Sequence, residues 1–176
     1  LTQNNYKVLS LPAVSRDLRK DCDLLIIAAP TRAWTGPEQE ELVKFLRERP
    51  FLFLADLNGW TGPEAFWKGL GIRWDGRLVR DPGRHFLLGE HYPIPILQPH
   101  PITEGLEDLL PILATAMSLT PLSPPEGVQI IPLLVTSKDA GPLTLAVTIR
   151  NSEGPAAVLV GAADFISNGL IQAPGN

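Results

Sequence analysis

Continuous apolar runs flank a helix-like apolar stripe in the first third of the chain. Residues 24–29 and 51–55 are apolar without interruption, which is typical of short strands covered on both faces. Between them, apolar side chains at 42–46 fall on one stripe of period 3.6. Residues 35–38, Thr-Gly-Pro-Glu, form a capping box with a proline in the first turn, and Pro50 stops the pattern. A helix is therefore predicted between the two strands.

A second capping signal and two further strand-like stretches extend this order. Residues 61–64 repeat Thr-Gly-Pro-Glu, and residues 66–70 carry the apolar face of the helix that should follow. Strands are also predicted at 6–11 and 156–160. Strands separated by helices of this length imply right-handed crossovers and a largely parallel sheet with helices on both faces. The predicted fold class is α/β, as a three-layer α/β/α sandwich of the flavodoxin-like kind.

The second half of the chain is richer in turns and in alternating stretches. Residues 73–101 contain Asp-Gly, Asp-Pro-Gly and Pro turn signals, which predict a hairpin insertion at the sheet edge. Apolar or alternating stretches at 112–119, 129–136 and 144–150 predict antiparallel strands, and a short helix is expected at 104–110. We therefore expect the sandwich to carry an antiparallel, strand-rich insertion.

Composition fits one compact domain and argues against several classes of partner. With 176 residues and 44% hydrophobic side chains, residues 1–176 can bury a single core. The net charge of −4 and the lack of any Lys or Arg run argue against binding to nucleic acid. Cys22 is the only cysteine, so no intrachain disulfide can form. The longest apolar stretch is far shorter than the roughly 18–20 residues that span a bilayer.

Polar residues follow three of the predicted buried strands. Because the carboxyl ends of parallel strands meet at one edge of an open α/β sheet, ligands usually bind there. The candidate ligand-binding residues at this edge are Thr31, Arg32, Asp56, Asn58, Asp164, Ser167 and Asn168. A simpler interpretation is that Asp164 and Ser167 cap a helix and that Asp56 closes a turn.

The sequence offers no recognisable catalytic group, metal site or cofactor loop. No Gly-x-Ser-x-Gly elbow is present, and no Lys-bearing phosphate loop follows a strand. His85, His91 and His100 have spacings that match no short metal-ligand motif. We therefore expect no cofactor, no metal and no catalytic residue.

Four tryptophans cluster in the first half of the chain. Trp34 and Trp60 lie in predicted loops after strands, where they are candidates for anchoring a partner protein. The alternative is that the tryptophans cover the ends of the core, as large amphipathic side chains commonly do.

The order of several short motifs resembles one family. The segments 21–30, 38–46, 51–56, 71–82, 100–103 and 158–168 resemble, in the same order, the motifs of ABC-type transport auxiliary proteins of the gliding-motility type. That family's extracytoplasmic domain implies a glutamine-amidotransferase-like fold without the catalytic Cys and His. Two departures occur: Arg49-Pro50 replaces a Gly-Gly pair, and Ala162-Ala163-Asp164 replaces Asp-Ser-Asp.

The resemblance also implies a setting. It implies a domain on the extracytoplasmic face of the membrane, beside ABC permease and ATPase subunits and anchored by segments outside this chain. The chain lacks an initiating Met, so we expect a domain cut from a larger, membrane-anchored protein. The leading hypothesis is a non-enzymatic interaction or ligand-sensing domain. Two alternatives stay open: a small-molecule or carbohydrate hydrolase that uses Asp56 and Asp164, and a structural scaffold that forms a homodimer through an edge strand or the tryptophan loops.

Overall fold

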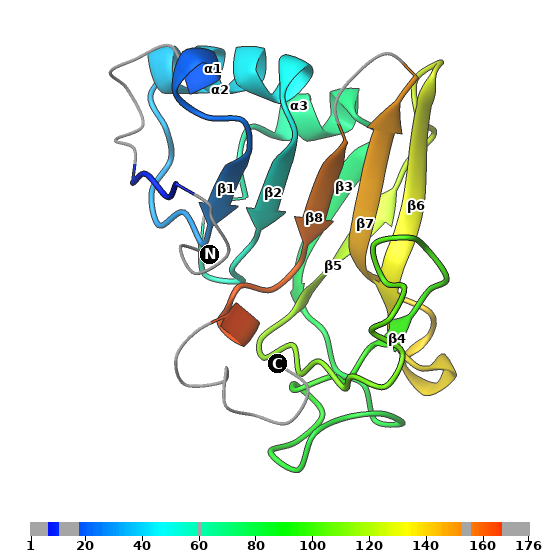
Figure 1. Ribbon diagram of the computed structural model, residues 1–176. Coiled ribbons are helices and arrows are strands. Elements are labelled where there is room, and N and C mark those ends of the chain that lie inside the picture. The colour runs from blue at the N-terminus through cyan, green and yellow to red at the C-terminus, as the bar shows by residue number, and fades with distance from the viewer. Residues whose placement is uncertain (1–6, 11–17, 60, 153–155, 167–176) are drawn as a thin grey trace.

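The computed structural model describes residues 7–10, 18–59, 61–152 and 156–166, which form one mixed sheet with a few helices (Figure 1). The α-helices are α1 (Leu18–Asp21), α2 (Gly36–Glu48) and α3 (Glu64–Gly69), and two 3₁₀ turns are η2 (Lys138–Ala140) and η3 (Asp164–Ile166). The strands are β1 (Leu25–Ala28), β2 (Phe51–Leu54), β3 (Ile72–Leu78), β4 (Ile96–Leu97), β5 (Met117–Pro121), β6 (Val128–Val135), β7 (Thr144–Asn151) and β8 (Ala157–Val160).

The strand order is β1-β2-β8-β7-β5-β3, with β6 also paired to β7 and β4 paired to β6. The neighbours β1, β2 and β8 run parallel, as the buried runs predicted. Every other pair is antiparallel, including β8 with β7 and β5 with β3. The parallel and antiparallel halves therefore belong to one continuous sheet.

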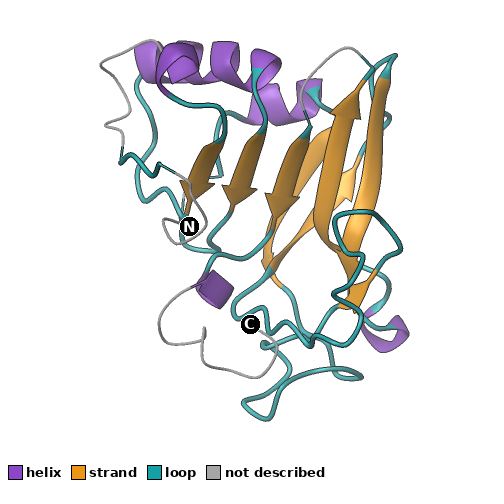
Figure 2. Cartoon of the chain, viewed as in Figure 1, coloured by secondary structure: helices purple, strands orange, loops and turns teal. Residues whose placement is uncertain are grey.

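The predicted three-layer sandwich is wrong, and the fold is a curled half-barrel with few helices. Only the step from β1 through α2 to β2 forms the expected parallel crossover. After α3 the chain instead runs to the far end of the sheet, where β3 pairs antiparallel with β5. The strands expected as an insertion thus build the middle of the sheet. Figure 2 shows the α-helices gathered near the ends where β1 and β2 begin.

The first predicted helix is confirmed and the second begins later than its capping signal implied. Helix α2 has Thr35 as its N-cap, and the Thr35 N–H donates to Glu38 Oε2 at 2.6 Å. Helix α3 begins at Glu64, directly after Pro63, so Thr61 is no cap. The Thr61 carbonyl instead accepts the Trp67 indole N–H at 2.5 Å.

Three further local predictions are wrong or only partly described. Residues 7–10 form no strand, and residues 104–110 form turns rather than a helix. Strand β5 begins only at Met117, because the backbone before it pairs with another loop: the Thr115 N–H donates to the His91 carbonyl at 3.2 Å, and Thr115 itself has φ +50°. Residues 6 and 11, the ends of the first predicted strand, lie outside the described part of the chain.

The main core fills the concave side of the curl. Helices α2 and α3 pack their apolar sides against inward-facing residues of β2, β7 and β8. The Trp67 ring lies in the middle, with its centroid 5.0 Å from that of Phe53 and 6.0 Å from that of Trp74. The convex side has a smaller cluster around Leu54 and Val160, while Ile26 on β1 is 42% exposed. Among the described helices, none has the length and hydropathy needed to cross a membrane.

Candidate functional site

The loops that follow β1, β2 and β8 meet at one edge of the sheet, as the sequence predicted. The Ala29 N–H donates to the Leu54 carbonyl, and the Ala55 N–H donates to the Val160 carbonyl, both at 2.9 Å. A Cβ added at Gly59 would lie 3.0 Å from the Pro30 carbonyl, so the first two loops are in close contact. The loops that carry the polar candidates therefore lie at one end of the molecule. The hydrogen bonds of each side chain show whether it is available to a ligand.

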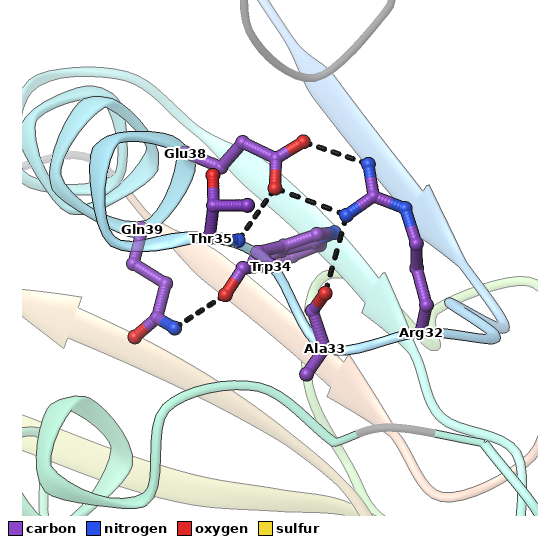
Figure 3. A network of polar contacts seen from close by, with 6 residues as sticks. All are labelled: Arg32, Ala33, Trp34, Thr35, Glu38 and Gln39. Atoms are coloured by element: carbon purple, nitrogen blue, oxygen red, sulfur yellow. Dashed lines mark hydrogen bonds and ion pairs between the residues drawn. The ribbon is translucent and has the colours of Figure 1, made fainter.

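Arg32 is held by the first turn of α2 rather than directed at a ligand (Figure 3). Its guanidinium donates to both carboxylate oxygens of Glu38, at 2.7 and 3.0 Å, and to the Ala33 carbonyl at 3.2 Å. The Glu38 side chain is 2% exposed and that of Arg32 is 63% exposed. Hydrogen bonds from Arg32 and then from the Thr35 N–H lower the pKa of Glu38 to about 2. The pair therefore anchors the loop after β1 to the helix, a bidentate contact of the strong class.

The loop after β2 is closed by its own aspartate. Asp56 Oδ1 accepts the Asn58 N–H at 2.7 Å, and the Asp56 carbonyl accepts the Gly59 N–H at 3.0 Å. This is the side-chain mimic of a turn that Asp commonly forms. Asn58 and Thr31 are exposed beside it. The interpretation of Asp56 as a turn residue accounts for these contacts.

Asp164, after β8, bonds to a distant segment. Its Oδ2 accepts the Thr115 hydroxyl at 2.8 Å, across 49 residues of sequence. The contact fastens the end of β8 to the segment that leads into β5. Ser167 and Asn168, the other candidates here, lie outside the described residues, as does Trp60.

Trp34 is half-buried against the main core, which matches the alternative interpretation better than that of a free anchor. The Trp34 carbonyl accepts the Gln39 side-chain amide at 2.7 Å (Figure 3). The histidines serve local contacts: His100 Nδ1 accepts the Ile102 N–H at 3.1 Å, and His91 packs beside Tyr92. The described ranges contain no group of three or more residues able to hold a metal ion.

Two open grooves lie away from this edge. One, of about 500 Å³, runs between the end of α2, α3 and the strands β6 to β8. The other, of about 630 Å³, lies between β3 and the loop before α3. Its lining is Gln39, Thr61, Gly62, Pro63, Glu64, Trp67, Ile72, Arg73 and Trp74. The sequence did not predict this groove, because only Trp34 and Trp60 were considered as partner-binding residues. The available signal was the pair of Trp67, in a predicted helix, and Trp74, in the strand-like stretch that follows it.

Comparison with known proteins supports the observed fold. No protein-family model matches the chain, and no curated protein matches its sequence. A solved structure described as "mmIFT52 N-terminal domain" is similar with a TM-score of 0.79 at 15% sequence identity. The alignment covers 99% of this chain and 81% of that chain. The half-barrel therefore occurs in a known structure, and at this identity the likeness concerns the fold.

Proposed function

We propose that this chain is a non-enzymatic interaction or ligand-sensing domain of a larger protein. The observation that carries the proposal is how the polar groups at the converging loops are used. Arg32 is bound to Glu38, and Asp164 is bound to Thr115. The two carboxylates that a hydrolase would need, Asp56 and Asp164, thus act as acceptors for the scaffold, which favours binding over catalysis.

A finer form of the proposal names the setting. The ordered sequence resemblance to ABC-type auxiliary proteins favours an extracytoplasmic domain whose partners are ABC permease and ATPase subunits. The similar solved structure is described as the N-terminal domain of its protein, which agrees with a domain of a longer chain. In this setting ATP hydrolysis would belong to the ATPase subunit.

The test is co-purification of the full-length protein from its native membranes. We expect permease and ATPase subunits to accompany the tagged protein in mild detergent, and to be lost when residues 1–176 are deleted. The matched control is the tagged deletion variant carried through the same purification. If no transporter subunit accompanies the intact protein, the finer proposal is wrong.

A further inference from the structure

Strand β1 forms one free edge of the sheet. It is the first strand in the order β1-β2-β8-β7-β5-β3 and pairs only with β2 among the strands that the structure describes. Figure 1 shows it at the side of the sheet, with no described strand beyond it. An edge strand leaves half of its main-chain N–H and C=O groups without a partner in the sheet. Such groups can bind another chain only where they are accessible.

The hydrogen-bond pattern shows which groups of β1 face outwards. The Leu25 N–H donates to the Pro50 carbonyl at 3.3 Å, and the Ala29 N–H donates to the end of β2 at 2.9 Å. In a parallel pair, residues that bond to the neighbouring strand alternate with residues whose groups point away from it. The odd-numbered residues of β1 therefore bond to β2. The N–H and C=O groups of Ile26 and Ala28 point to the free edge, and no described residue bonds to them.

These outward-facing residues are accessible to solvent. Ile26 is 42% exposed, Ala28 is exposed as well, and Leu24, directly before the strand, is 49% exposed. Ile27, between them, is buried in the main core. Alternate residues of a strand face the same side, so Leu24, Ile26 and Ala28 form an exposed apolar row on the convex side. The edge thus offers main-chain groups and apolar side chains that a second chain can reach.

The start of β1 also carries an exposed negative charge. The Asp23 side chain is 101% exposed, and Arg49 Nη1 lies 3.7 Å from its Oδ1. A solvent-exposed pair of this kind contributes little, so the carboxylate can still attract another cation. The whole chain has a net charge of −4. A positively charged ligand is therefore favoured at this edge.

We propose that the free edge of β1 binds an extended, positively charged segment of a partner protein, which adds to the sheet as a strand. The segment's main chain would pair with Ile26 and Ala28, and a Lys or Arg of the segment would lie beside Asp23. Its apolar side chains would pack against the row that begins at Leu24. Strand addition takes its affinity from main-chain hydrogen bonds and its specificity from alternate side chains. The proposal rests on the chain being an interaction domain, whichever protein it meets.

A cationic segment suits this edge better than a second copy of the chain does. Two copies each carry a charge of −4, so their electrostatic interaction is repulsive. Strand β1 has only 4 residues, so two rigid domains joined along it have little surface with which to reach the roughly 1,200 Å² of a stable interface. A short edge strand with a charge beside it is also a common protection against self-pairing. A flexible segment can instead follow both the edge and the apolar row.

Amide hydrogen exchange of the 176-residue chain provides the first test. We expect the amides of Ile26 and Ala28 to exchange freely, and those of Leu25 and Ala29 to exchange more slowly because they bond to β2. Protection of Ile26 and Ala28 in a dilute, monomeric sample would mean that the chain itself already covers the edge, and would overturn the proposal. Protection that rises with protein concentration would identify a second copy as the occupant, which also overturns it.

A displayed library of random 12-residue peptides provides the second test. We expect the enriched peptides to carry Lys or Arg, to protect Ile26 and Ala28 from exchange, and to bind more weakly at high salt. Ile26→Pro removes the outward N–H without removing a bond to β2, and should weaken binding about tenfold or more. Ile26→Val keeps that N–H and should bind the peptides as the wild type does. Peptides N-methylated at the amides that face β1 test the same bonds without changing the domain, and should also lose binding.

The variant Asp23→Asn tests the charge. It should weaken binding about two- to fivefold at low salt and reduce the dependence on salt. The matched control, Asp108→Asn, removes an exposed carboxylate in the loop between β4 and β5 and should leave affinity unchanged. Enriched peptides that bind both variants equally well would show that the edge does not select a cationic segment, which overturns the proposal.

Two further results of the library test would overturn the proposal. These are peptides that bind without protecting Ile26 and Ala28, and a library that yields no peptide sensitive to N-methylation. Both results differ from a failure of the proposed function. A chain that retains its membrane partners yet binds no segment at β1 would still be an interaction domain, acting through another surface.

Discussion

The ring centroids of Phe53 and Trp74 lie 5.7 Å apart, although three strands, β8, β7 and β5, separate their own strands in the sheet. Four steps across a flat sheet would place β2 and β3 about 19 Å apart, at roughly 4.8 Å for each step. The sheet must therefore curl until its two ends face each other. Trp67 from α3 fills the space between them and closes the open side of the half-barrel.

Removing the Phe53 ring should destabilise the domain more than removing a ring at the margin of the same cluster. Phe53 is 0% exposed and contacts both Trp67 and Trp74. Phe53→Ala is expected to cost about 3–5 kcal/mol in the free energy of unfolding, because the cavity lies where the curl closes. Phe66→Ala, at a half-buried position beside Trp67, should cost clearly less. Urea unfolding followed by tryptophan fluorescence measures both, and equal losses would contradict this account of the core.

The local elements were largely predictable, but their assembly was not. The continuous apolar runs predicted β1, β2 and β8 as parallel strands. The expected cover on both faces is wrong for β1, where Ile26 is 42% exposed. The path after α3 had no such signal. Strand β3 alternates polar and apolar side chains, which suits an edge strand at either end of a sheet. The prediction that a second parallel crossover follows α3 was therefore wrong. The sandwich prediction failed at that step.

Glu38 should make the stability of the domain depend on pH in the acidic range. Its pKa is about 2 in the folded chain, held down first by Arg32, and near 4.5 when unperturbed. A lowered folded pKa stabilises the fold fully above about pH 4.5, and this contribution is lost as the pH falls towards 2. Glu38→Gln should therefore be less stable than the wild type at pH 7, and the difference should shrink below pH 4. Thermal unfolding at several pH values tests this.

The matched control is Glu40→Gln, which changes an exposed residue on the same helix. It should follow the wild-type curve across the whole range. A Glu38→Gln difference that stays constant from pH 7 to pH 2.5 would show that the carboxylate charge does not anchor the loop.

The candidate site was predictable in its position and not in its bonding. Parallel strands bring their carboxyl ends together, which places Arg32, Asp56 and Asp164 at one edge whatever the rest of the sheet does. The partner of Asp164 is Thr115, which has φ +50° and whose N–H donates to the His91 carbonyl. No local pattern specifies a contact over that distance. The groove at β3 could not be predicted for the same reason, because its position depends on the place of β3 in the sheet.

Asp81 should be a strong determinant of stability although it lies in an irregular loop. It is fully buried and accepts hydrogen bonds from the N–H groups of Gly83 and Arg84 and from both the N–H and the hydroxyl of Ser137. Burial opposes ionisation, but these donors outweigh it and lower the pKa of the carboxyl. Asp81→Ala leaves several buried donors without an acceptor and should cost about 3–5 kcal/mol.

Asp139→Ala is the control for Asp81, because Asp139 approaches the same loop at Gly83 but is exposed. It should change the free energy of unfolding by less than about 1 kcal/mol. Chemical denaturation of both variants at pH 7 measures the contrast. Similar losses would mean that Asp81 is not the residue that joins this loop to the β6–β7 connection.

Gly161 should tolerate no side chain, because the end of β8 contacts the backbone of β5 there. A Cβ at Gly161 would lie 1.9 Å from the Met117 carbonyl oxygen, and the Gly161 carbonyl accepts the Met117 N–H at 2.7 Å. Gly161→Ala must displace β5 and should cost about 4 kcal/mol or more. Gly69→Ala, with no atom within 4 Å of the new Cβ, should be neutral or stabilising by up to about 1 kcal/mol. If both variants unfold at the same urea concentration, the backbone that follows β8 does not lie against the start of β5.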